Sequence, residues 1–229
     1  MKTLKVIGCL LHYPDAELQA HGDELLAAVE AEPRLSVAQR EALAGLIRRT
    51  VKSDLLELQA EYGETFDRGR SRSLHLFEHV HGESRDRGQA MLDLAEVYRE
   101  AGFEIDCSEL PDYLPLFLEF CAQIPEADAR EWLEQVAHIL QLLHQRLAQR
   151  ESPYAAAMSA LVALAGARTG VAEVRDQVAA ESPDDTPAAL DRVWMEDPVT
   201  FAGSCDPAGN GQTTHTVHWE GRRADGSKL

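Results

Sequence analysis

Cysteine is scarce in this sequence, and its few cysteines are not closely paired. Only four occur among 229 residues, and no two of them form a C-x-x-C pair. Disulfide-rich secreted domains and zinc ribbons both depend on closely spaced cysteines. The sequence therefore predicts neither class of protein.

Long apolar runs are also missing. The longest, residues 154–167, is interrupted by Ser159, and it is shorter than the roughly 20 residues that a membrane-spanning helix needs. The short apolar stretch at residues 6–11 leads directly into His12-Tyr13-Pro14, without the small-residue cleavage pattern of a signal peptide. We expect a cytoplasmic protein with no membrane insertion.

Positive charge is in the minority. The chain has 22 Lys and Arg residues against 39 Asp and Glu residues, a net charge of −17. Nucleic acids and anionic membranes select for clustered positive charge, so neither is an expected partner. Hydrophobic residues make up 45% of the chain, which is too many for wholesale disorder. The composition thus predicts an acidic, globular protein.

Much of the negative charge lies in one stretch. Residues 93–134 contain twelve acidic residues and two arginines, a net charge of −10. An acidic rim around an apolar groove would attract a basic amphipathic helix. An ordinary solvated acidic face is the alternative interpretation.

Apolar residues recur at the three-and-four spacing of helices, and strand-like alternation is nearly absent. We predict an all-α chain, a single helical-bundle domain of about eight helices at residues 1–180, followed by an extended or disordered C-terminal tail at residues 181–229. Asp15 and Ser36, the latter with Gln39 in a capping box, are expected to begin helices. The expected helices cover residues 15–30, 36–62, 73–81, 84–101, 114–120, 126–149, 152–165 and 171–180.

One short motif is typical of zinc enzymes. His75, Glu78 and His79 fit the H-x-x-E-H pattern of inverted zinc peptidases. On one helical face, the two imidazoles would bind zinc while the glutamate activates water, with His81 and Glu83 as further ligands nearby. The pattern is short, however, and its expected helix is only about nine residues long. Side chains that line a surface or pack between helices are the plainer alternative, and a specific binding surface is the third.

Longer stretches around this motif carry a resemblance to a known family. Residues 62–68 (YGETFDR) and 73–91 (SLHLFEHVHGESRDRGQAM) strongly resemble the signature of the NarJ family, the molybdenum cofactor assembly chaperones of membrane-bound respiratory nitrate reductase. Residues 109–114 (ELPDYL) resemble the E-x-P-D-H motif of the wider redox-enzyme maturation chaperones, which include TorD and DmsD, with Tyr113 in place of the usual His. The resemblance covers about residues 1–200.

The resemblance implies a TorD-like, all-helical cytoplasmic protein that is not an enzyme and has no cofactor of its own. Its implied partner is the apo catalytic (alpha) subunit of nitrate reductase, bound chiefly through that subunit's N-terminal segment. The chaperone would hold this subunit competent for molybdenum cofactor insertion before membrane docking. Transient contact with the molybdenum cofactor is left open, and so is service to another molybdoenzyme.

The residues expected to bind the client come from the two motifs. They are Tyr62, Phe66, Asp67, Arg68, His75, Glu78, His79, His81, Glu83, Arg85, Arg87, Glu109, Pro111, Asp112 and Tyr113.

Some of these residues also have structural interpretations. Asp112 is predicted to cap the following helix, and Tyr113 offers an apolar ring with a hydroxyl group to a binding surface. The arginines of the first motif are expected to form internal ion pairs, such as Arg68 or Arg85 with Glu78 or Asp86. Contact with carboxylates of the client or with the cofactor phosphate is the alternative.

Overall fold

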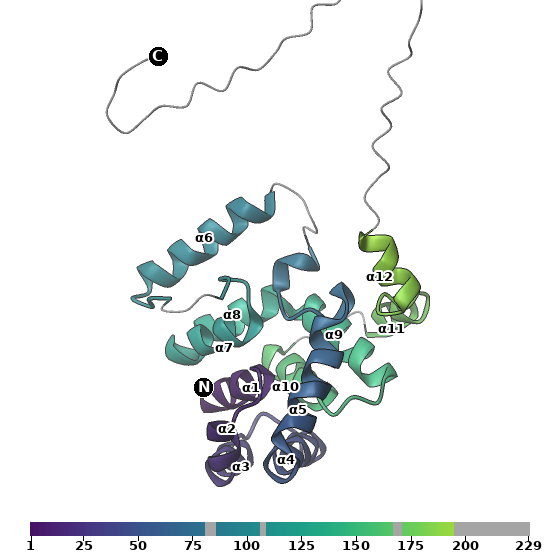
Figure 1. Ribbon diagram of the computed structural model, residues 1–229. Helices are drawn as coiled ribbons and strands as arrows, with labels where there is room; N and C mark the ends of the chain where they lie inside the picture. Colours follow the sequence, from purple (N-terminus) through teal and green to yellow (C-terminus); the bar gives the residue numbers. More distant parts are fainter. Residues whose placement is uncertain (81–85, 106–108, 167–170, 195–229) are drawn as a thin grey trace, which may run out of the picture. The chain divides into compact units, whose positions relative to one another are not determined.

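The computed structural model describes residues 1–80, 86–105, 109–166 and 171–194. The chain divides into two units, Met1–Val193 and Trp194–Leu229, and the description below concerns the first. Its described residues form twelve α-helices, two short 3-10 helices, one π-helix and no strand (Figure 1). The prediction of an all-α fold is confirmed.

The helices follow one another with short connections. They are α1 (Lys2–Leu11), α2 (Ala16–Ala20), α3 (Gly22–Glu30), α4 (Val37–Lys52), α5 (Leu55–Tyr62), η1 (Gly63–Asp67), η2 (Arg70–Arg72), η3 (Leu76–Glu78), α6 (Asp86–Glu100), α7 (Leu114–Gln123), α8 (Glu126–Gln135), α9 (Ala137–Gln149), α10 (Ala155–Ala165), α11 (Val171–Ala179) and α12 (Pro187–Trp194). None of these described helices is long and apolar enough to cross a membrane.

Two helix starts agree with the cap residues expected from the sequence. The Asp15 carboxylate accepts a hydrogen bond from the backbone N–H of Leu18 at 2.7 Å. Ser36 and Gln39 form the reciprocal capping box, with donor–acceptor distances of 3.2 Å and 3.0 Å. Both caps satisfy backbone donors that have no partner within the helix.

The described residues form four more α-helices than the expected eight. Three predicted helices are each divided, α1 and α12 lie outside the predicted ranges, and the described part of residues 73–81 forms no α-helix. Residues 15–30 form α2 and α3, residues 36–62 form α4 and α5, and residues 126–149 form α8 and α9. Asp54 explains one break, since its carboxylate caps α5 by accepting from Leu56 N at 2.9 Å. At Val136 the backbone leaves the helical region, with φ −98° and ψ 3°, and no local signal marks this break.

The predicted helix at residues 73–81 is wrong, because only the 3-10 helix η3 lies within its described part. Its backbone pairs instead with the second motif. Leu76 N donates to the carbonyl of Asp112 at 2.9 Å, and Leu114 N donates to the carbonyl of Leu74 at 2.8 Å. These bonds surround an antiparallel bridge between His75 and Tyr113, so the backbone groups are not free to form an α-helix.

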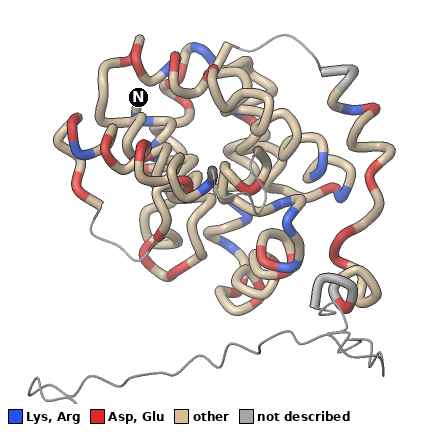
Figure 2. The backbone as a smooth tube through the Cα atoms, turned by 90° about the horizontal axis from the view of Figure 1, so that it is seen from above, with Lys and Arg blue, Asp and Glu red and all other residues tan. Residues whose placement is uncertain are grey.

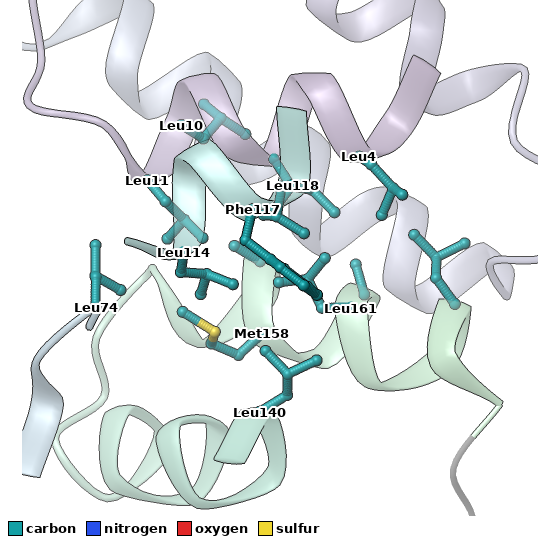
Figure 3. Packing of buried hydrophobic residues seen from close by; sticks show 14 of the residues in the cluster. Leu4, Leu10, Leu11, Leu74, Leu114, Phe117, Leu118, Leu140, Met158 and Leu161 are labelled. Carbon is teal, nitrogen blue, oxygen red and sulfur yellow. The ribbon is translucent and has the colours of Figure 1, made fainter. Parts of the chain in front are cut away.

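The core forms where α1, α7, α9 and α10 meet (Figure 3). Gly8 lets α1 approach α7 closely, since a Cβ atom there would lie 3.3 Å from the carbonyl oxygen of Pro115. Fully or almost fully buried leucines fill this interface on both sides. The buried residues shown in the close view include Leu4, Leu10, Leu11, Leu74, Leu114, Phe117, Leu118, Leu140, Met158 and Leu161.

A further helix, α12, lies in the segment that was expected to be extended, and this expectation is wrong for residues 187–194. Thr186 and Pro187 explain the helix, because Thr186 Oγ1 accepts from Ala189 N at 3.2 Å and proline is favoured at a first helical position. The limits at residues 1–180 and 181–229 stay a prediction, and residues 195–229 lie outside the described part of the chain.

Candidate functional site

Asp112 joins the two sequence motifs. Its side chain is completely buried, and one carboxylate oxygen accepts from Phe77 N at 3.1 Å. The other oxygen lies 3.2 Å from Nδ1 of His75. The expected cap on α7 is wrong, because Tyr113 occupies the N-cap position and the Asp112 carboxylate points to the segment around His75 instead.

The two histidines of the zinc-like pattern have different surroundings. The hydrogen bond to Asp112 raises the pKa of His75, whereas burial lowers the pKa of His79. His79 Nε2 lies 2.8 Å from the carbonyl of Ser73, which requires a proton on Nε2. Its Nδ1 then accepts from Arg146 at 3.3 Å, so both ring nitrogens are engaged.

This arrangement does not support the zinc hypothesis. His75 and His79 are not on one face of an α-helix, because only a 3-10 turn lies between them. The described residues contain no group of three His, Cys, Asp or Glu side chains that would hold a metal ion. His81 and Glu83 lie outside the described residues.

Tyr113 is more buried than expected, with 9% of its surface exposed. Its hydroxyl lies 3.2 Å from the Tyr62 hydroxyl, and Tyr62 donates to the carbonyl of Leu11 at 2.9 Å. Tyr113 therefore donates to Tyr62. Burial raises the pKa of both phenols, so the pair stays neutral and ties the second motif to the end of α1.

Beside this pair lies a pocket of about 420 Å³, which we call the motif pocket. Seven of the expected client-binding residues line it, and they come from both motifs. They are Tyr62, Phe66, Asp67, Arg68, His75, Glu78 and Tyr113.

Two more pockets follow along α1. The middle pocket, of about 250 Å³, shares Tyr113 with the motif pocket and includes Glu109 and Glu119. The α1 pocket, of about 620 Å³, lies between α1 and the α2–α3 region. Each pocket shares at least one lining residue with its neighbour, so the three are adjacent, and we call them together the pocket row. The residues common to the middle and α1 pockets are Lys5, Cys9 and His12.

Sequence reasoning missed this part of the site. Lys5 and Cys9 are exposed positions on α1, whose other positions from Thr3 to Leu11 are buried, and the exposed His12 directly follows the helix as its C-cap. Their spacing of four and three residues places them on one helical face. That pattern was readable in the sequence, but a solvent-facing stripe has the same spacing.

The remaining predicted residues are placed as follows. Arg68 pairs with Glu64 at 2.9 Å rather than with Glu78, since Glu64 lies one helical turn away. Arg87 pairs with Glu78 at 3.2 Å. The carbonyl of Pro111 accepts from the Tyr98 hydroxyl at 2.9 Å, and Arg85 lies outside the described residues.

Acidic positions are spread over many elements of the unit (Figure 2). The described acidic residues of the strongly acidic stretch lie on α6, α7 and α8 and in the connections between them. Of these described residues, only Glu109 and Glu119 line the middle pocket. The negative charge therefore borders the pocket row without being confined to it.

Comparisons with known proteins agree with the two motifs. A family model described as nitrate reductase delta subunit matches residues 32–160. The chain is also 46% identical to the nitrate reductase molybdenum cofactor assembly chaperone NarJ of Escherichia coli. The 218 matched residues cover 95% of this chain and 91% of the relative. The chain belongs to the nitrate reductase delta subunit family.

Other relatives of this delta subunit family are similar over much of their length. The probable assembly chaperone NarW of Escherichia coli is 47% identical over 90% of this chain and 88% of the relative. The probable assembly chaperone NarJ of Bacillus subtilis is 32% identical over 70% of this chain and 86% of the relative. These relatives are chaperones rather than catalysts, which agrees with the expectation that the chain is not an enzyme.

Proposed function

We propose that this chain is a cytoplasmic chaperone that binds the apo catalytic subunit of membrane-bound nitrate reductase. It holds that subunit, chiefly by its N-terminal segment, in a state competent for molybdenum cofactor insertion before membrane docking. The proposal combines the family's role in nitrate reductase assembly with the pocket row along α1.

The pocket row is the observation that supports a peptide client. It is a series of three adjacent hollows rather than one closed cavity, which suits an extended ligand such as a helix laid along the surface. Partly buried apolar residues, including Leu25 and Leu116, line it. They offer contacts to the apolar face of such a helix.

Charge favours a basic face on the same ligand. Five carboxylates and two lysines line the α1 and middle pockets, a net charge of −3. They are Asp15, Glu17, Glu24, Glu109 and Glu119 against Lys2 and Lys5. Acidic groups at the rim increase the rate of encounter with a basic segment, and salt reduces this effect. A basic amphipathic helix therefore fits both the walls and the rim.

Calorimetric titration of the full chain with a synthetic peptide of the reductase subunit's N-terminal residues tests this proposal. We expect saturable binding with a dissociation constant from about micromolar to nanomolar, or about 8 to 12 kcal/mol. Cys9→Arg places a large cation where the middle and α1 pockets meet, and it should weaken binding about tenfold or more.

Ala38→Arg is the matched control, because Ala38 is an exposed position on α4 and lines none of the three pockets of the row. It should bind as the unmodified chain does. Absence of heat with the reductase peptide would contradict the proposal. Equal affinity for the leader peptide of another molybdoenzyme would point to a broader client range instead.

A further inference from the structure

The connection between α11 and α12 crosses the turn formed by residues 69–72. We call residues 181–185 of this connection the strap. Ser182 and Pro183 are exposed, so the strap buries no apolar side chain. Its three carboxylates hold it in place.

Asp184 is the strap carboxylate that binds the turn itself. Asp184 accepts from Ser71 N at 2.7 Å and from Ser71 Oγ at 2.8 Å. Gly69 makes room for it, since a Cβ atom there would lie 2.7 Å from Asp184 Oδ2. Any larger residue at position 69 would collide with the carboxylate.

Arginines hold the other two carboxylates. Asp185 accepts from Arg150 at 2.6 and 2.7 Å and from Arg72 at 3.2 Å. Glu181 accepts from Arg146 at 2.6 and 2.8 Å. Paired hydrogen bonds of this kind are the usual geometry of arginine with a carboxylate. We call Ser71, Arg72, Arg146 and Arg150 together the arginine cradle.

The cradle needs an anion. Only 2% of the Arg72 side chain is exposed, and a buried guanidinium without a carboxylate partner is strongly destabilising. Arg72 lies 3.7 Å from Asp184 as well as 3.2 Å from Asp185. Hydrogen bonds from Arg150 hold the pKa of Asp185 below its usual value, so this partner stays ionised at neutral pH.

The cradle also lies next to the motif pocket. Asp184 lines that pocket together with Gly69 and Arg70. A ligand that extends beyond the motif pocket at this side meets the strap. The strap therefore borders the motif pocket through Asp184 while it covers the cradle.

We propose that the arginine cradle is a docking site for an acidic peptide segment of a partner, and that the strap occupies it in cis until the partner displaces it. Because the strap is tethered, its effective concentration is high. A partner already held in the pocket row competes at a similarly high concentration, and in this respect the inference rests on the proposed function.

A titration without any reductase peptide tests the cradle. The probe is a synthetic peptide of residues 180–188, the chain's own strap sequence, added to the full-length Asp184→Asn/Asp185→Asn variant. We expect the variant to bind this peptide at least about tenfold more tightly than the unmodified chain does. A peptide with asparagine at both aspartate positions keeps only Glu181 for Arg146 and should bind at least about tenfold more weakly.

The matched control is Asp176→Asn/Asp191→Asn, which removes the same charge from exposed positions on α11 and α12. It should behave as the unmodified chain does. Amide hydrogen exchange at Ser71 locates the effect, because its N–H donates to Asp184. Exchange should be faster in the strap variant and slow again when the peptide is added.

Equal peptide binding by the strap variant and the control would overturn the proposal, and so would unchanged exchange at Ser71. Should the double variant not fold, Asp185→Asn alone frees Arg150 and leaves Asp184 as the carboxylate beside the buried Arg72. It is titrated with the same peptide and should bind it more tightly than the control does. Because the titration contains no client, its failure leaves the proposed function intact. Conversely, failure of the titration with the reductase peptide leaves the result of the strap-peptide titration unchanged.

Discussion

Nδ1 of His75 lies 3.2 Å from Oδ1 of Asp112, across 37 positions of the chain. This contact and the backbone bridge beside it hold together two motifs that are far apart in the sequence. Asp112 is the centre of the arrangement, because it also accepts from the backbone of Phe77. The two motifs therefore depend on each other for their geometry.

Asp112→Ala should reduce the stability of the whole unit. The change leaves the Phe77 N–H without its partner and removes the anion that faces His75, which costs about 3 kcal/mol by analogy with other broken buried charged pairs. Urea unfolding followed by circular dichroism measures this free energy. Glu109→Ala is the control, since Glu109 is exposed in the same motif. A similar small loss in both variants would show that Asp112 is not structural.

His75→Gln and His79→Gln should have opposite pH profiles. The raised pKa of His75 means that its contribution to stability is complete below about pH 6.5 and is lost as the pH rises through the folded-state pKa. The lowered pKa of His79 means that its contribution is present above about pH 6.5 and is lost as the pH falls through the folded-state pKa.

The free energy of unfolding, measured for each variant at several pH values, checks both signs. We expect His75→Gln to be most costly at about pH 5.5 and His79→Gln at about pH 8. Parallel profiles for the two variants would mean that the His75–Asp112 contact does not determine the protonation of His75.

Tyr113 allows its hydroxyl and its ring to be tested separately. Tyr113→Phe removes one hydrogen bond to Tyr62 and should cost about 1 kcal/mol, with the affinity for the client peptide unchanged. Tyr113→Ala removes the wall shared by the motif and middle pockets. It should cost about 3–5 kcal/mol and weaken client binding about tenfold. Unfolding and calorimetry measure the two effects, and equal losses of affinity in both variants would argue against a role of the ring.

Much of the local structure could be predicted from the sequence because its causes lie within a few residues. The caps at Asp15 and Ser36 formed as expected, since each cap bonds to a donor three residues away. The cap at Asp54 was equally readable but overlooked. The break at Val136 was not readable, because no local hydrogen bond or special residue marks it.

Seven of the expected client-binding residues line the motif pocket, so the structure brings parts of the two motifs together. Their role in client binding stays a prediction. The roles of Asp112 and Arg68 were misjudged. Their partners depend on which segments lie beside them in the folded chain, and charge alone offers several equally good pairs.

The sequence by itself determined an acidic, all-helical chain of the nitrate reductase delta subunit family, since helical periodicity, caps and signature words are properties of neighbouring residues. The tertiary structure decided that residues 74–76 pair with 112–114 rather than continue a helix. It also decided that α1 borders the pocket row and that the strap covers the arginine cradle. Each of these features joins segments far apart in the chain, and only packing of the whole unit selects among the pairings that local sequence allows.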